Sequence, residues 1–290
     1  MTIPRLPSTR PSGKVTVLIT WDGQSLPLAC VHIDAVPDFE LILFDYSGRA
    51  ATGTSLTLER GAFRLAAKIL SERTECKGDI FQALGRHLGG YSEIPEYVGV
   101  LDDDIVITIS DLNRILHIAR IKQLDVFAPA LTHDSEFSHR WTLQQPHILA
   151  REVPWVEVMM PFYRGDLFLV SVPFFTGYVT SWGFDMFLFP MLQKLTGAER
   201  CGLVDAVMAS HSRPVTSQNK VYNNGLTADQ EMFAIKTTCI AYLKDNHPDL
   251  LNTDWFRRLF VPPKESFYNR TRKRLRRLGR PIKQWLAKGT

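Results

Sequence analysis

The stretch Val98-Gly99-Val100-Leu101-Asp102-Asp103-Asp104-Ile105 joins an apolar run to three consecutive carboxylates, and apolar residues resume directly after it. The apolar part has the length and composition of a buried strand. Three adjacent anions repel one another, so a fold that places them at a strand end must offset that repulsion, most simply with a divalent cation bound through oxygen. The stretch is therefore a candidate metal and phosphate site, and a solvated acidic turn is the alternative.

Length and composition favour one large globular domain. The chain has 290 residues, of which 45% are hydrophobic and 22% charged, which is enough for an α/β domain with a sizeable core. Its four cysteines lack metal-ligand spacing, which argues against a zinc site or a disulfide scaffold and fits a reducing cytosol. Residues 1–13 are predicted to be a flexible end without the apolar core of a signal peptide, and no apolar segment is long enough to span a bilayer.

Strand and helix patterns are predicted to alternate along the chain. The predicted strands cover 14–20, 39–44, 98–101, 126–131 and 201–209, and the predicted helices cover 60–72, 79–88, 112–119 and 227–244. Asp111 is the expected cap of the third helix, and Thr227 with Gln230 has capping-box spacing at the start of the fourth. This alternation indicates an α/β fold with a mixed, mostly parallel sheet covered by helices on both faces.

In such sheets ligands bind at the carboxyl ends of the strands. Asp22, Asp45 and the aspartates 102–104 would all lie at this edge. His211 would lie at the end of the strand predicted over 201–209, and its pairing with the aspartates favours a site, whereas a lone histidine there is more often a surface residue. The polar residues after His211, up to about Thr227, are predicted to form a mobile loop.

Residues 153–192 are dense in aromatic side chains and contain the island Trp182-Gly183-Phe184-Asp185. Aromatic residues beside glycine and a carboxylate suit a site that stacks on sugar rings. An ordinary aromatic core has much the same composition, so both interpretations stay open.

Three segments in this order resemble motifs of nucleotide-sugar glycosyltransferases of the GT-A fold: Leu-Asp-Asp-Asp-Ile at 101–105, Trp-Gly-Phe-Asp at 182–185 and Val-Asp-Ala-Val-Met-Ala-Ser-His at 204–211. A plant and bacterial family of uncharacterised GT-A-like proteins is also similar in Leu-Phe-Asp-Tyr-Ser-Gly at 43–48 and Val-Glu-Val-Met-Met-Pro at 156–161. The likeness covers roughly residues 14–215.

This resemblance implies a GT-A-like catalytic domain over 14–265, divided into a nucleotide-binding half, 14–110, and an acceptor half, 111–265. Residues 266–290 would then form a separate basic tail. The resemblance carries nothing over after about residue 215.

The resemblance also implies a metal site. In GT-A enzymes an Asp-x-Asp at the end of a central strand holds Mn²⁺ or Mg²⁺ on the diphosphate of the donor, and the cation offsets the charge of the departing diphosphate. That role falls on Asp104, with Asp102 nearer the ribose and a further candidate ligand, and Asp103 is open because three aspartates allow two registers. His211 resembles the histidine that completes the coordination.

Donor contacts beyond the metal are implied for residues on neighbouring segments. Asp22 and Asp45 resemble positions that contact the nucleoside. Lys77 would place a cation near the phosphates, and an exposed lysine is the alternative.

The acceptor side of the implied site is the segment from Trp182 to Asp185. Asp185 is similar to the carboxylate that removes the proton of the attacking hydroxyl in inverting transferases. Glu157 is the alternative base or an acceptor-binding residue, and Trp182 and Gly183 would contact the acceptor. A structural alternative is that Asp185 caps the following helix.

From Asn269 to Thr290 the chain carries nine Lys and Arg and no acid, which leaves a net charge of −5 on the rest (+4 less nine). Apolar residues interleave with these cations, as in an amphipathic helix on an anionic membrane surface. Nucleic-acid binding and a solvated tail are the alternatives.

The sequence as a whole predicts a cytoplasmic, metal-dependent glycosyltransferase, peripheral at the inner face of a membrane. It would move a sugar from a nucleotide-sugar donor to a glycan or lipid-linked acceptor, with inversion, in polysaccharide biosynthesis. The alternatives are a nucleotidyl or phosphosugar transferase, a catalytically silent nucleotide-sugar-binding protein and a nucleic-acid binder. The negative charge of the body of the chain argues against the last of these.

Overall fold

The computed structural model describes residues 3–25, 31–213 and 220–261. The chain separates into two compact units, Met1–Cys239 and Ile240–Thr290. The sequence predicted one domain over 14–265, whereas the division between the units falls within helix α5 (Ala228–Asn246). The predicted amphipathic tail, 266–290, lies outside the described residues.

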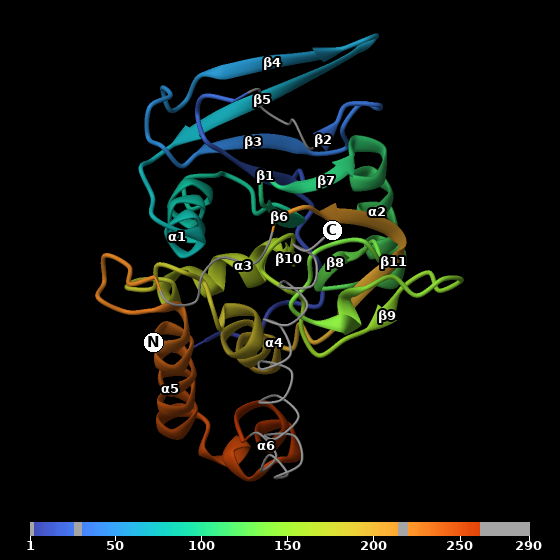
Figure 1. The fold of residues 1–290 in the computed structure, drawn as a ribbon. Helices are drawn as coiled ribbons and strands as arrows, with labels where there is room; N and C mark the ends of the chain where they lie inside the picture. The colour runs from blue at the N-terminus through green and yellow to red at the C-terminus, as the bar shows by residue number, and fades with distance from the viewer. Residues whose placement is uncertain (1–2, 26–30, 214–219, 262–290) are drawn as a thin grey trace, which may run out of the picture. The chain divides into compact units, whose positions relative to one another are not determined.

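The first unit is built on a mixed sheet of 11 strands (Figure 1). They are β1 (Thr16–Trp21), β2 (Val31–His32), β3 (Glu40–Asp45), β4 (Ser55–Arg60), β5 (Phe63–Ser71), β6 (Tyr97–Leu101), β7 (Ile105–Thr108), β8 (Val126–Leu131), β9 (Arg151–Glu152), β10 (Phe162–Arg164) and β11 (Cys201–His211). Their order is β2-β7-β11-β8-β10-β6-β1-β3-β5-β4, with β9 paired to β11.

The central strands β6, β1, β3 and β5 run parallel to one another. Strands β1, β3 and β6 are buried along almost their whole length, which explains their continuous apolar sequence. Ile19 of β1 lies opposite Leu101 of β6, and Trp21 lies opposite Asp45 of β3. The residues that follow these strands therefore meet at one edge of the sheet, as the sequence predicted.

Helices pack on both faces of this sheet. They are α1 (Lys77–Leu88), α2 (Ile109–Lys122), α3 (Gly165–Ser171) and α4 (Phe189–Thr196), with short helical turns η1 (Arg140–Thr142) and η2 (Val172–Phe174) and a π-helix, η3 (Phe184–Leu188). Tyr163 of β10 meets Phe81 of α1, with ring centroids 6.1 Å apart. Its neighbour Phe162 points to the opposite face, where it stacks on Phe127. The predicted α/β class is thus confirmed.

The second unit contains the end of α5 and two short helical segments. These are η4 (Pro248–Asn252) and α6 (Asp254–Phe260).

The helix predicted over 60–72 is wrong, because these residues form β5 and the turn that joins it to β4. Gly61 opens a two-residue turn with a φ of 60°, a conformation that favours glycine. Leu65 and Ala67 are buried, whereas Ala66 between them is exposed, so the burial has the period of a strand. Ala66 and Ala67 lie on opposite faces of the strand, since alanine is small enough for either environment. Their apolar character nevertheless fitted the spacing of a helix.

Two helix starts can be compared with their predicted caps. Thr108, and not Asp111, caps α2: its hydroxyl accepts from the backbone N–H of Asp111 at 3.0 Å and donates to the Asp111 carboxylate at 2.9 Å. At the start of α5 the predicted capping box is confirmed, because Thr227 and Gln230 exchange both hydrogen bonds between side chain and backbone.

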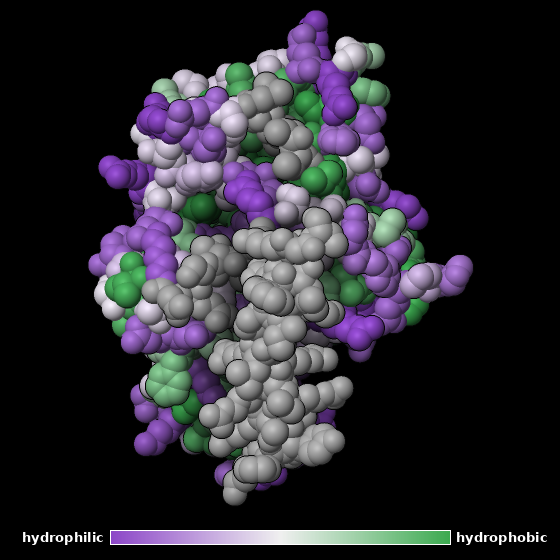
Figure 2. All heavy atoms as spheres, viewed as in Figure 1, coloured by the Kyte–Doolittle hydropathy of each residue, from purple (hydrophilic) through white to green (hydrophobic). Residues whose placement is uncertain are grey.

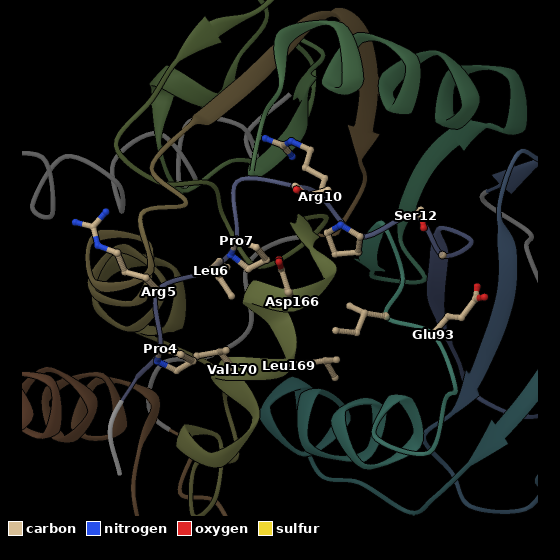
Figure 3. A pocket seen from close by; sticks show the side chains of 14 residues that line it. Pro4, Arg5, Leu6, Pro7, Arg10, Ser12, Glu93, Asp166, Leu169 and Val170 are labelled. Atoms are coloured by element: carbon tan, nitrogen blue, oxygen red, sulfur yellow. The ribbon is translucent and has the colours of Figure 1, made fainter.

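Residues 3–13 were predicted to be a flexible end but are tied to the domain. Arg10 donates to Asp125 at 2.7 Å and to the carbonyl of Leu124 at 2.9 Å, and Arg164 donates to the carbonyl of Pro7. A pocket of about 720 Å³ lies between this segment and α3, and Figure 3 shows the side chains that line it. Arg10, within the proline-rich segment, donates to the domain, and Arg164 of β10 donates back to the segment, so the two arginines hold it in place.

On the face shown in Figure 2, the coloured residues are mostly hydrophilic, with smaller hydrophobic spots between them. Among the helices of the described residues, none combines the length and apolarity needed to cross a bilayer.

We expect Gly99→Ala in β6 to lower the free energy of unfolding by about 1–3 kcal/mol. A Cβ at Gly99 would lie 2.5 Å from Cε1 of Phe162, whose ring is held by stacking on Phe127. Gly90→Ala is the control, because its Cβ would meet only the His87 carbonyl oxygen at 3.5 Å. Denaturant unfolding measures both, and equal losses in the two variants would contradict this packing argument.

Candidate active site

Each of the three adjacent aspartates meets a basic side chain from another part of the chain. Asp102 accepts a hydrogen bond from Lys77 Nζ at 2.7 Å, and the same ammonium donates to the Met159 carbonyl at 3.0 Å. Lys77 is only 8% exposed, so the alternative of an exposed lysine is wrong. Burial raises the pKa of Asp102, and the charge of Lys77 opposes that shift.

Asp103 connects the ends of three strands. Its backbone N–H donates to the Thr20 hydroxyl at 2.9 Å, and its carboxylate accepts from the Tyr46 hydroxyl at 3.0 Å and from Arg213 at 2.9 Å. Burial, with the charge of Asp103, raises the pKa of Tyr46 to about 12. The backbone of Asp103 thus bonds to β1, and its carboxylate bonds to residues that follow β3 and β11.

Asp104 pairs with His211, whose Nε2 lies 3.3 Å from Asp104 Oδ2. His211 Nδ1 is 2.9 Å from the carbonyl oxygen of Glu136, which can only accept, so Nδ1 carries the proton and Nε2 faces the aspartate. The hydrogen bond to Asp104 raises the pKa of His211. Asp104 Oδ1 is buried and has no hydrogen-bond partner among the described residues.

This pair fits a divalent cation. Two ligand atoms 3.3 Å apart can share one ion at metal-ligand distances of about 2.1 Å, and a carboxylate suits Mn²⁺ or Mg²⁺. The unpartnered Oδ1 offers a further oxygen. Asp102 is bonded to Lys77 instead, and within residues 3–25, 31–213 and 220–261 no group of three His, Cys, Asp or Glu is placed to hold a metal. A cation here would need oxygen ligands from a bound molecule.

The predicted nucleoside residues shape two turns beside this cluster. Asp45 is fully buried and accepts hydrogen bonds from Ser47, Ala50 and Ser71, among others. Burial alone would raise the pKa of Asp45, and these donors lower it to about 2. Asp22 accepts from the backbone N–H groups of the turn that follows β1. Both carboxylates fix turns whose backbone lies at the carboxyl edge of the parallel strands. The oxygens of Asp45 are occupied by these hydrogen bonds.

The two candidate bases lie close together. Burial, with the negative charge of Asp185, raises the pKa of Glu157 to about 7. Burial likewise raises the pKa of Asp185 to about 7, although backbone N–H groups of Met186 and Val158 oppose the shift. Glu157 is 8% exposed, and within the described part of the chain its Oε2 has no hydrogen-bond partner. The fold thus gathers two carboxyl groups that can exchange protons near neutral pH.

The segment that carries Asp185 has uncommon backbone conformations. Ser181 has a φ of 64° and Gly183 a φ of 95°, and the π-helix η3 follows directly. Such conformations persist where the surroundings enforce them and cluster at functional sites. Glu231 of α5, fully buried, holds the segment by accepting from the backbone N–H groups of Val179 at 2.6 Å and Thr180 at 2.7 Å.

Trp182 and Gly183, the predicted acceptor contacts, both pack against other residues of the fold. Trp182 is partly buried and packs against a small cluster that contains Val179 and Tyr222. A Cβ at Gly183 would meet Met232 at 3.3 Å. The alternative that Asp185 caps the following helix is wrong, because Asp185 lies inside η3, whose N-cap is Gly183, and neither η3 nor α4 has a side-chain cap. Its Oδ1 accepts from the Met186 N–H at 2.8 Å.

Three aromatic residues lie beside Glu157, of which Trp155 belongs to the aromatic stretch 153–192 noted in the sequence, whereas His139 and Trp141 were not predicted. His139 and Trp141 precede β9, and Trp155 follows it. His139 Nε2 lies 3.7 Å from Glu157 Oε1, and the rings of His139 and Trp155 meet edge to face at 4.8 Å. Large aromatic residues in a long connection between strands were the available signal.

The fold and these contacts define a mixed α/β domain with a carboxylate cluster at the carboxyl ends of its central parallel strands. A scan against protein-family models finds no match, and a search of the curated proteins finds none.

Solved structures of S. aureus TarS are similar to this chain. TarS 1-349 in complex with UDP-GlcNAc matches over 83% of this chain and 67% of that chain, with 11% identity and a TM-score of 0.47. The same fragment in complex with UDP matches over 83% and 66%, with 13% identity and a TM-score of 0.44. This chain therefore spans about two thirds of that fragment's length, and 40% of the longer TarS structure.

We expect Lys77→Met to lower the free energy of unfolding by about 3 kcal/mol, because it leaves Asp102 partly buried without its cation. The double variant with Asp102→Asn should recover part of this loss. Lys194→Met is the control, because Lys194 pairs with the exposed Glu199 and should cost at most about 1 kcal/mol. Equal losses in the two lysine variants, by denaturant unfolding, would refute the proposed charge compensation.

Proposed function

We propose that this protein is a divalent-metal-dependent glycosyltransferase that moves a sugar from a nucleotide-diphosphate sugar to a glycan or lipid-linked acceptor, with inversion. The observation that carries the proposal is the convergence of two pairs of groups. Asp104 and His211 form a pair that fits a cation, and Asp185 and Glu157 form a pair of carboxyl groups that titrates near neutral pH. A positive charge on His211 would lower the pKa of Glu157, which supports a common neighbourhood for the two pairs.

The donor would bind at the end of the parallel strands. Mn²⁺ or Mg²⁺ held by Asp104 and His211 would offset the negative charge of the departing diphosphate. The turns after β1 and β3, shaped by Asp22 and Asp45, would border the nucleoside. Lys77 would add positive charge near the phosphates while it stays bonded to Asp102.

Asp185 would act on the acceptor as general base. Its carboxylate removes the proton of the acceptor hydroxyl while that oxygen attacks the anomeric carbon, and the bond from this carbon to the phosphate oxygen breaks with its electron pair leaving on the diphosphate. Glu157, buried beside it, would accept or donate a hydrogen bond to another acceptor hydroxyl. A base held by the backbone at Met186 is oriented before the acceptor arrives.

The transfer rate should fall about tenfold per pH unit below about pH 7, because Asp185 has a pKa of about 7 and acts only when it is deprotonated. Asp185→Asn should reduce transfer by about a hundredfold or more and abolish this pH dependence, with nucleotide affinity unchanged. Asp38→Asn, at an exposed position, is the control. A pH profile of kcat that Asp185→Asn leaves unaltered would reject Asp185 as the base.

A thermal-shift screen of nucleoside diphosphates with and without Mn²⁺ tests the donor site. A ligand at a hundredfold excess over its Kd should add about 2.7 kcal/mol to the stability. Asp104→Ala and His211→Ala should each remove the Mn²⁺-dependent part of the shift, because each loses a proposed ligand. The exposed Asp38→Ala and His117→Ala are matched controls. Metal dependence that survives in both site variants would disprove this metal site.

A further inference from the structure

We propose that His139, Trp141 and Trp155, named here the aromatic corner, form with Glu157 the binding site for a pyranose ring of a neutral carbohydrate acceptor. The inference rests on the proposed function and makes it more specific, because it selects a glycan over a lipid chain as the part of the acceptor that is recognised.

The three rings of the aromatic corner pack against one another. Trp141 and Trp155 are perpendicular with centroids 4.9 Å apart, and His139 lies edge to face on Trp155 at 4.8 Å and stacks over Trp141 at 5.9 Å. None of the three is buried: all keep part of their surface exposed. Mutual packing fixes the rings, so a ligand does not have to order them on binding.

The corner is also anchored from behind. Arg151 donates to the carbonyls of Trp141 at 2.7 Å and Leu143 at 2.9 Å, and to the carboxylate of Asp205 at 2.9 Å. The Asp205 side chain is fully buried and accepts a further bond from the backbone of Gln145. A buried ion pair therefore positions the connection that carries Trp141, although this connection lies partly at the surface.

Glu157 provides the second, polar element of this site. Its side chain is 9% exposed and lies against His139, and Oε2 is buried with no hydrogen-bond partner in the described residues. An unsatisfied buried oxygen of this kind is costly unless a ligand or water bonds to it. A hydroxyl donor from a ligand on the aromatic corner would meet that need.

These features match the chemistry of a sugar ring. A pyranose presents a face of C–H groups that packs on aromatic rings, and a rim of hydroxyls that donate to a carboxylate. A lipid chain would leave Glu157 unsatisfied. A phosphate group would bring negative charge against Glu157, whose pKa is already raised by burial and by the charge of Asp185. A neutral carbohydrate is therefore the ligand that this arrangement favours.

The test is binding of the full-length protein to an array of neutral glycans. Wild type should bind at least one glycan, and Trp155→Ala and Trp141→Ala should weaken that binding by about tenfold or more. Trp155→Phe should retain most of it because it keeps an aromatic face. Trp255→Ala, in the second unit, is the matched control. Glu157→Gln should also weaken binding without loss of the folded state.

The thermal shift by a nucleoside diphosphate with Mn²⁺ separates this inference from the proposed function. All aromatic variants should keep that shift, which also shows that they are folded. Absence of glycan binding by wild type, or equal binding by Trp155→Ala, overturns the acceptor site while the shift persists. Loss of the shift in wild type alongside normal glycan binding would instead reject the donor site and leave a carbohydrate-binding protein.

Discussion

Compensation of three adjacent negative charges is the constraint on which the architecture of this edge depends. Asp102, Asp103 and Asp104 follow a fully buried strand, and each is met by a different basic side chain, Lys77 at 2.7 Å, Arg213 at 2.9 Å and His211 at 3.3 Å. Those partners come from the start of α1 and from the end of β11. The repulsion among the aspartates is therefore offset by two features of the fold. Helix α1 begins beside β6, which brings Lys77 to Asp102, and β11 extends as far as residue 211, which brings His211 to Asp104.

A backbone segment at the same edge adopts unfavourable conformations, and contacts with other parts of the fold stabilise it. The segment before Asp185 contains Ser181 with a positive φ and leads into a π-helix, which are unfavourable conformations for an isolated chain. Glu231 from α5 holds this segment through backbone hydrogen bonds, and so fixes the position of Asp185. The turn between β6 and β7 and the end of β11 supply the pair proposed to bind a cation, whereas the segment before η3 leads to the carboxylate that the proposed reaction needs.

Two environments at this edge give their carboxylates opposite properties. Asp45 is buried but accepts many hydrogen bonds, so its pKa falls to about 2 and it stays ionised. Glu157 and Asp185 are desolvated with fewer donors, so their pKa values rise to about 7 and they can exchange protons. The first environment builds a turn, and the second suits acid-base chemistry. The aromatic corner beside Glu157 extends the second environment toward a ligand.

The sequence by itself determined β1, β3, β6, β8 and β11, since their apolar runs are long and end at polar turns, and it placed Asp22, Asp45 and the aspartates 102–104 at one edge. It failed at residues 60–72, where small apolar residues fit a helix and a strand equally well. Only the tertiary structure decided which cation meets which aspartate, because Lys77 lies 25 positions from Asp102 and Arg213 lies 110 from Asp103. It also decided that Glu157 and Asp185 share a desolvated neighbourhood beside the aromatic corner. Such pairings depend on the packing of distant segments, and burial, which sets the pKa of a carboxyl group, is a property of that packing and not of local sequence.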